Sequence, residues 1–200
     1  MRNRYLRTLL TPEVQAEQIR AYGRTRVPQE TDMELGLGAE ERTFIAHRDS
    51  FYLASVTEEG WPYVQHRGGP PGFLHVASPT TLLFPDYNGN RQLISAANVV
   101  HRRRVALFLM DYVARERLKI LGHADVLSAA EAEAWLRKLA VPPRTQVERV
   151  IRLEVVGYDW NCSKYITPRF TSADVEATLA PLRTRIADLE AQLRTEGPAA

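Results

Sequence analysis

The sequence predicts a mainly β domain with helices around it, an α+β protein built on an antiparallel barrel. Short β-branched and aromatic runs follow one another with turn residues between them, as antiparallel strands do. Helical patterns lie before, between and after these runs without the regular alternation of βαβ units. The chain has 200 residues, enough to bury a core in one domain without disulfides.

The N-terminal segment, residues 1–38, is predicted to be a helical extension ahead of the barrel. Thr11 and Pro12 have the pattern of an N-cap followed by proline at the first helical position. We expect the helix that they open to end near Gly23, and a loop to follow it. The barrel domain is then expected to occupy residues 39–170.

Within this domain the pattern alternates between strand-like runs and brief helices. The expected order is a helix over 39–48, strands near 51–57, 61–66, 73–77 and 80–84, a helix over 90–97, strands near 105–113 and 118–127, a helix over 128–139, and a last strand over 147–160. Ser128 and Glu131 form a capping box, which predicts the start of the last helix, and Pro142 ends it.

The C-terminal segment, residues 171–200, is predicted to be an amphipathic helix with heptad spacing. Its apolar residues step by four and three, in the a/d rhythm of a coiled coil: Val175, Leu179, Leu182, Ile186, Leu189 and Leu193. Because proline breaks a helix interior but suits a first turn, we expect a short piece from Ser172 and a fresh helix from about Pro181. The periodicity fits a contact between two copies and a helix lying on its own barrel equally well.

Composition argues against several classes of protein. The net charge of +2 is too small to indicate a nucleic-acid partner, and only the arginines of the first 26 residues favour one. The single cysteine, Cys162, excludes an internal disulfide framework and fits a reducing compartment. No apolar run is long enough for a membrane span or signal peptide, so a cytoplasmic protein without a membrane partner is expected. The histidines lack metal-site spacing, and no metal is predicted.

Two places in the barrel sequence have the residues needed to bind a phosphate. Between Asn88 and Ser95 a turn leads into the predicted helix, where free N–H groups favour an anion and Arg91 adds a bidentate donor. Arg67 ends a predicted strand beside Gly68 and Gly69, where backbone can approach a ligand closely.

Together these runs resemble the pyridoxamine 5′-phosphate oxidase family, especially its group of predicted flavin-nucleotide-binding proteins, from about Arg42 to Phe170. The resemblance implies a six-stranded antiparallel split barrel of the FMN-binding type. It also implies a homodimer with the flavin at the subunit interface, and FMN as the cofactor.

The positions that match the family's flavin site come from five segments of the chain. They are Gln65, His66 and Arg67 in one strand, Phe84, Pro85 and Asp86 beside the ring, Asn88, Arg91, Gln92 and Ser95 in the phosphate turn, Arg117 and Lys119 in a later strand, and Trp160 with Asn161 in a closing segment. No catalytic side chain can be assigned.

Departures from the family argue against vitamin B6 oxidation. Gln92 replaces a lysine of the oxidases, Gln65 replaces an arginine, and the heptad helix replaces their substrate-binding C-terminal segment. The resemblance therefore predicts an FMN-dependent oxidoreductase that exchanges hydride through flavin N5 with an unidentified small molecule or NAD(P)H. The alternatives are a non-catalytic flavin-binding or redox-sensing module, and the same barrel using deazaflavin or haem.

Overall fold

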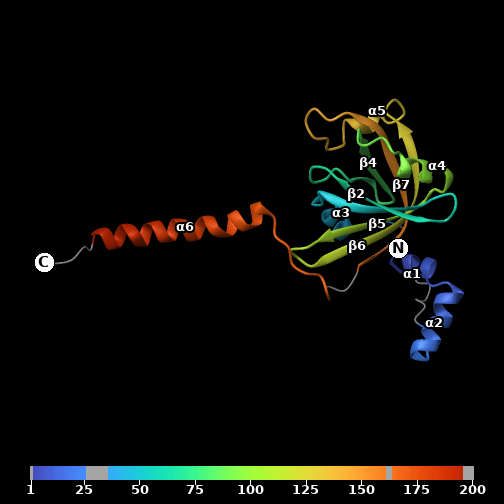
Figure 1. Cartoon of the computed structure of the whole chain (residues 1–200), viewed down its shortest axis with the longest axis horizontal. Coiled ribbons are helices and arrows are strands. Elements are labelled where there is room, and N and C mark those ends of the chain that lie inside the picture. The colour runs from blue at the N-terminus through green and yellow to red at the C-terminus, as the bar shows by residue number, and fades with distance from the viewer. Residues whose placement is uncertain (1, 26–35, 161–163, 196–200) are drawn as a thin grey trace.

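A computed structural model describes residues 2–25, 36–160 and 164–195 of the chain. One seven-stranded sheet forms the centre of the molecule, in the order β2-β1-β5-β6-β7-β4-β3 (Figure 1). Every neighbouring pair is antiparallel. The split-barrel class expected from the sequence is confirmed, with the seven strands predicted along the chain and one more than the six that the family resemblance implied.

The elements follow the predicted order closely. The strands are β1 (Ser50–Val56), β2 (Pro62–Gly68), β3 (His75–Ser78), β4 (Thr81–Tyr87), β5 (Arg104–Asp111), β6 (Glu116–Ser128) and β7 (Val147–Trp160). The helices are α1 (Arg2–Leu9), α2 (Pro12–Tyr22), α3 (Ala39–Ala46), α4 (Ile94–His101), α5 (Glu133–Leu136) and α6 (Ser172–Thr195).

The two longest strands, β6 and β7, join the two halves of the sheet. β7 pairs with β6 along most of its length and with β4 along its first half. The β6–β7 register shifts between Leu121 and Gly122. A Cβ on Gly122 would lie 2.6 Å from Leu153 Cδ2 and 2.7 Å from the carbonyl oxygen of Glu154, so only glycine lets the strands approach this closely.

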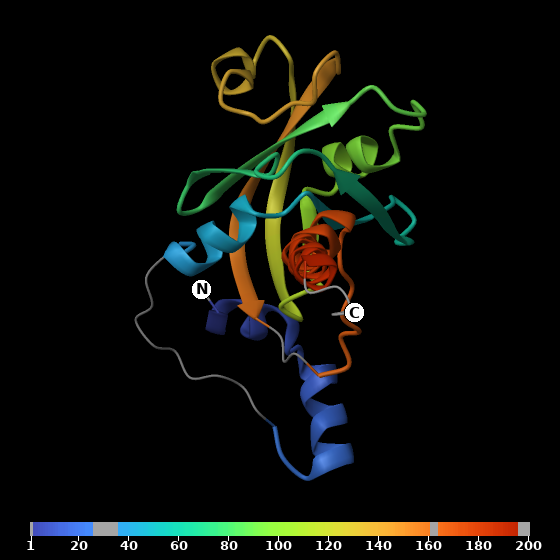
Figure 2. The same ribbon diagram turned by 90° about the vertical axis from the view of Figure 1, so that its left-hand side faces the viewer.

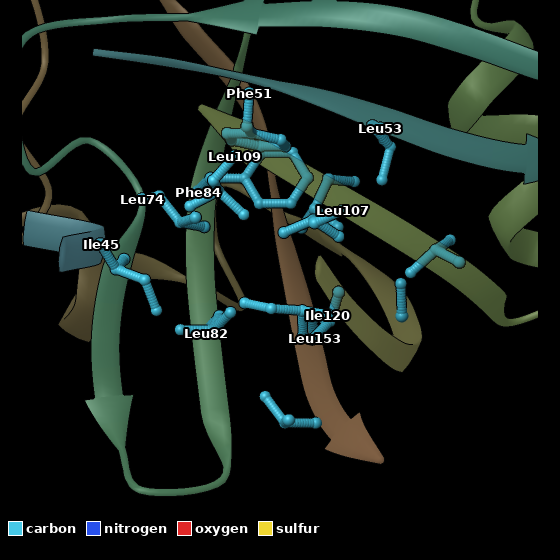
Figure 3. Packing of buried hydrophobic residues seen from close by; sticks show 14 of the residues in the cluster. Ile45, Phe51, Leu53, Leu74, Leu82, Phe84, Leu107, Leu109, Ile120 and Leu153 are labelled. Carbon is cyan, nitrogen blue, oxygen red and sulfur yellow. The ribbon is translucent and has the colours of Figure 1, made fainter. Parts of the chain in front are cut away.

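The main core fills the concave side of the sheet (Figure 3). Alternate residues of β5 and β6 point inward, including the fully buried Leu107 and Ile120. Phe51 contacts Phe73 in a stacked arrangement at 5.4 Å between ring centroids and meets Phe84 edge-on at 5.1 Å. This aromatic cluster links β1 to β4 and to the segment that follows β2.

The predicted helix over 128–139 is wrong in length. The capping box is present, because Ser128 N donates to Glu131 Oε2 at 2.7 Å, but only α5 is helical after it. The segment instead turns to bury Ala132 and Leu139 in a small second core against β4 and β7. Burial of these side chains outweighs the local helix signal.

The N-terminal residues form two helices. α2 begins and ends as predicted, with Thr11 Oγ1 accepting from Val14 N at 3.4 Å and Gly23 as a left-handed C-cap. The first of the two helices, α1, was not predicted as a separate helix; it packs against β7 and buries Tyr5. There the close approach requires glycine, since a Cβ on Gly157 would lie 2.7 Å from Tyr5 N.

The C-terminal helix α6 runs unbroken through Pro181, so the predicted break there is wrong. It extends away from the barrel in Figure 1 and is seen end-on in Figure 2. From Ser172 to Arg194 every side chain except that of Asp174 is exposed. The alternative in which this helix lies on its own barrel is therefore wrong. No helix among the described residues is both long and apolar enough to cross a bilayer.

Candidate functional site

A pocket of about 280 Å³ lies between β2, β4, the start of α4 and the start of β7. We call it the arginine pocket. Its wall includes eight of the residues predicted from the sequence: Gln65, His66, Arg67, Pro85, Asp86, Arg91, Gln92 and Ser95. These residues come from segments up to 30 positions apart in the sequence, and the pairing of strands brings them together.

Asp86 holds two arginines of the pocket in place. Arg67 Nη1 donates to Asp86 Oδ1 at 2.5 Å, and Arg149 Nε donates to Asp86 Oδ2 at 2.9 Å. Arg149 Nη2 also donates to Glu148 Oε2 at 2.8 Å. Burial alone would lower the pKa of Arg149, but the hydrogen bond and charge of Asp86 outweigh it and raise that pKa. Asp86 thus fixes both guanidiniums at the pocket wall.

One donor of this network has no acceptor. Arg67 Nε is buried and makes no hydrogen bond among the residues that the structure describes. Buried N–H groups are nearly always paired, so an orphaned donor on a pocket wall indicates a place where a ligand acceptor fits.

The start of α4 forms the facing wall. Its N-cap, Leu93, has φ 55° and offers no side-chain acceptor, so the amides of the first turn lack capping partners. Arg91 also has a left-handed φ of 59°, a strained conformation for a residue other than glycine. Ser95 Oγ donates to Gln65 Oε1 at 2.7 Å and thereby ties the helix to β2. Anions favour such a helix start.

Two other predicted residues are adjacent to the arginine pocket but do not line it. Phe84 belongs to the core, where its ring meets Phe51 edge-on. Asn88 is exposed, and its backbone N–H donates to Gln146 O at 3.2 Å.

Arg117 and Lys119 line a second cavity of about 560 Å³ on the outer face of β1, β5 and β6. We call it the outer cavity, and its wall is largely aromatic and apolar, with Tyr5, Tyr52, Phe108, Tyr112 and Tyr165 among its residues. Arg117 Nε is buried without a partner among the described residues, while Lys119 Nζ pairs with Asp159 Oδ2 at 3.0 Å.

A single copy of the chain therefore does not bring all of the predicted flavin residues together. Tyr52 of the outer cavity meets His66 of the arginine pocket edge-on, with 5.7 Å between ring centroids, so the two cavities are neighbours at β2. Trp160 lies elsewhere, with Nε1 donating to Glu41 Oε1 at 2.8 Å and its ring against Phe44. Asn161 lies outside the described residues.

Several residues of the arginine pocket were not predicted from the sequence. The most important is Arg149, together with Glu148, Tyr63 and Phe73. Arg149 reaches the pocket because it faces Asp86 in the β4–β7 register. No local signal in the sequence reveals a pairing between strands 63 positions apart. Among the described residues, no group of three or more potential ligands is arranged to hold a metal ion.

Several solved structures are similar to this chain and align with most of its length. A single-residue variant of HupZ from Group A Streptococcus aligns over 62% of this chain and 99% of its own, at 14% identity and a TM-score of 0.50. A putative pyridoxamine 5′-phosphate oxidase from Lactobacillus delbrueckii aligns over 65% and 98%, at 21% identity and a TM-score of 0.48. An FMN-binding protein from Syntrophomonas wolfei aligns over 60% and 83%, at 11% identity and a TM-score of 0.49. Curated proteins gave no match.

Fold and pocket define a split-barrel protein with an arginine-lined pocket. Residues 37–158 match the family model described as pyridoxamine 5′-phosphate oxidase. Since the match covers more than half of the chain, this protein belongs to the pyridoxamine 5′-phosphate oxidase family, as its sequence led us to expect. It is thus a member of a flavin-binding family.

Proposed function

We propose that this chain is a cytoplasmic FMN-dependent oxidoreductase that works as a homodimer. The observation that carries the proposal is the unpartnered buried Nε of Arg67, a residue that lines the arginine pocket together with the uncapped start of α4. Both are hydrogen-bond donors suited to a phosphate group.

The charge of the arginine pocket fits an anion. Three guanidiniums, of Arg67, Arg91 and Arg149, face two carboxylates, of Asp86 and Glu148, which leaves one positive charge in excess. The helix start adds a partial positive charge of about half a unit. FMN has the required phosphate, whereas riboflavin lacks it.

The size of the pocket supports a site shared between two copies. About 280 Å³ is slightly below the range of about 300–1,000 Å³ that is usual for drug-sized ligands. The arginine pocket would therefore hold the phosphate end, and the ring would need a further wall. The aromatic outer cavity, with Arg117 and its unpartnered Nε, is a suitable wall for an aromatic ring when a second copy supplies it.

The residues of the arginine pocket would bind and orient the cofactor. Arg67 and Arg91 would donate to phosphate oxygens, and Asp86 would keep Arg67 in place. Gln65, held through its Oε1 by Ser95, would leave its amide N–H groups for the chain of the ligand. When bound, FMN would supply the redox chemistry, hydride exchange at N5 with a small molecule or NAD(P)H.

The phosphate assignment is tested by titrating apoprotein with FMN and with riboflavin. We expect riboflavin to bind more weakly than FMN. Either Arg67→Met or Arg91→Ala should lower the affinity for FMN roughly ten- to hundredfold, since each charged hydrogen bond contributes about 1.5–3 kcal/mol. Arg103→Met is the matched control, because Arg103 pairs with Asp125 outside the pocket. Equal affinity for both ligands would refute the assignment.

The redox part needs a separate measurement. Bleaching of the bound flavin by NADH or NADPH, followed by reoxidation, would support an oxidoreductase. A protein that binds FMN but is not reduced by either nicotinamide would refute NAD(P)H as the hydride donor and would favour a non-catalytic flavin-binding or redox-sensing module.

A further inference from the structure

The helix α6 exposes a regular apolar stripe to water. Its six members, Val175, Leu179, Leu182, Ile186, Leu189 and Leu193, are between 37% and 70% exposed. Six large apolar side chains on one face of a 24-residue helix make a contiguous surface that water solvates poorly. Since α6 extends away from its own barrel, the partner for this stripe must come from elsewhere.

Heptad spacing assigns each residue of α6 to a position around a coiled-coil seam. Leu179, Ile186 and Leu193 are at a, and Val175, Leu182 and Leu189 are at d. Pro181 then falls at c and Thr184 at f, both on the outward side. The proline therefore removes a backbone hydrogen bond without placing its ring in the seam.

The flanking charges discriminate between the two ways of pairing two such helices. In a parallel, in-register pair, position g of one helix meets position e of the next heptad on the other. Arg185 at g then meets the partner subunit's Glu190 at e, and symmetry makes this ion pair twice. Both side chains are exposed in the single copy.

The antiparallel pair that aligns all six apolar residues has the opposite electrostatics. It places Leu182 of one helix against the partner's Ile186. Residues at position e of one helix then meet residues at position e of the other, and residues at g meet residues at g. Arg183 then meets the partner's Arg183, and Arg185 meets the partner's Arg185. Glu176 likewise meets the partner's Glu190, so every charged pair at the seam is repulsive.

We propose that α6 pairs with α6 of a second copy as a parallel, in-register, two-stranded coiled coil. Fewer than three heptads are marginal in isolation. If the barrels also pair, as the proposed function requires, the tether raises the effective concentration of the helices to about the millimolar range, which favours even a weak contact. The parallel pair keeps a twofold axis along the helices, so each copy uses the same surface. It requires no bound flavin.

Disulfide trapping tests the geometry in full-length protein that carries Cys162→Ser, since Cys162 is the single native cysteine. Leu189→Cys should oxidise rapidly to a linked dimer, because position d faces its own copy only in the parallel register. Thr184→Cys at the outward f position is the control and should not. The antiparallel arrangement would instead link Leu179→Cys of one tagged chain to Leu189→Cys of another. That product, or equal linking through Thr184→Cys, would overturn the proposal.

A charge exchange gives a second readout. Arg185→Glu should weaken the α6 contact roughly twofold to thirtyfold, judged by the rate of trapping through Leu189→Cys, because two exposed pairs become repulsive. Adding Glu190→Arg should restore the rate, while circular dichroism checks that α6 stays helical. If Arg185→Glu slows the trapping and Glu190→Arg does not restore its rate, the parallel register is wrong. FMN affinity should not change in either variant, so a failure of the flavin proposal is distinguishable from a failure of this one.

Discussion

Arg149 donates its Nε to Oδ2 of Asp86 across 2.9 Å, and these two residues face each other in the register of β7 and β4. Asp86 Oδ1 is simultaneously occupied by Arg67. In the free protein, a buried carboxylate thus separates two guanidiniums that would otherwise repel. Asp86 lies between two cationic side chains, and the phosphate of a ligand could neutralise the same two charges.

Asp86→Asn should lower the stability of the apoprotein and increase the stabilisation that FMN provides. Removing a carboxylate between two largely buried arginines leaves their charges uncompensated, and we expect the free energy of unfolding to fall by about 1–3 kcal/mol. A bound phosphate would relieve that repulsion, so the rise in melting temperature on adding FMN should exceed that of the wild type.

Asp125→Asn is the matched control for this prediction. Asp125 also lies between two arginines, Arg103 and Arg152, but these are about half exposed and lie outside the arginine pocket. The control should lose little stability and respond to FMN like the wild type. If FMN stabilises Asp86→Asn less than the wild type, then Asp86 acts by positioning Arg67 and not by neutralising it.

Local signals predicted well those parts of the fold that local interactions decide. The caps of α2 at Thr11 and Gly23 are short-range hydrogen bonds and were correct. The helix after Ser128 was overpredicted, because burial of Ala132 in the second core competes with its capping box. Pro181 does not end α6, although the local rule favours a break there.

The candidate site was predictable only in part for the same reason. Arg67 and Ser95 were predicted because they lie near a strand end and a helix start, and Gln65 was predicted from its match to the family's flavin site. Arg149 depends on a pairing between distant strands, which one sequence does not reveal. Arg117 was expected to line the same pocket. The order of the strands alone does not tell whether a residue completes the pocket of its own copy or the pocket of a second copy.

The FMN-loaded protein should not turn over pyridoxamine or pyridoxine 5′-phosphate at ordinary enzyme rates. The oxidases use an arginine- and histidine-rich C-terminal segment for the substrate phosphate, and this chain has α6 there, extended away from the barrel. Oxygen-coupled assays for pyridoxal phosphate provide the measurement. Turnover on the order of 1 per second or faster would contradict the prediction.

His75 should make the protein less stable as the pH falls below about 6.5. Burial lowers the pKa of His75, and the charge of Lys138 lowers it further. The unfolded chain then binds more protons than the folded one below the unfolded pKa of about 6.5, and stability is lost as the pH falls toward the folded pKa.

His75→Gln should remove this contribution to the pH dependence. Urea unfolding at about pH 7.5 and about pH 5.5 measures the difference in free energy of unfolding, which should shrink in the variant. His101→Gln is the control, because His101 is exposed at the end of α4. An unchanged difference in His75→Gln would show that other groups cause the acid sensitivity.

Truncation after Thr171 should leave a dimer that still binds FMN. The proposed flavin site uses the arginine pocket and the outer cavity, and both are built from residues before this point. Because α6 covers no part of its own barrel, its removal should leave the melting temperature of the barrel nearly unchanged. Only the dimer dissociation constant should rise, because the second contact between the copies is gone.

Sedimentation of the truncated protein over a concentration series measures the dimer dissociation constant, and flavin absorbance followed in the same cell measures FMN binding. A truncated protein that sediments as a monomer and has lost its flavin would show that α6, and not the barrel, makes the functional assembly.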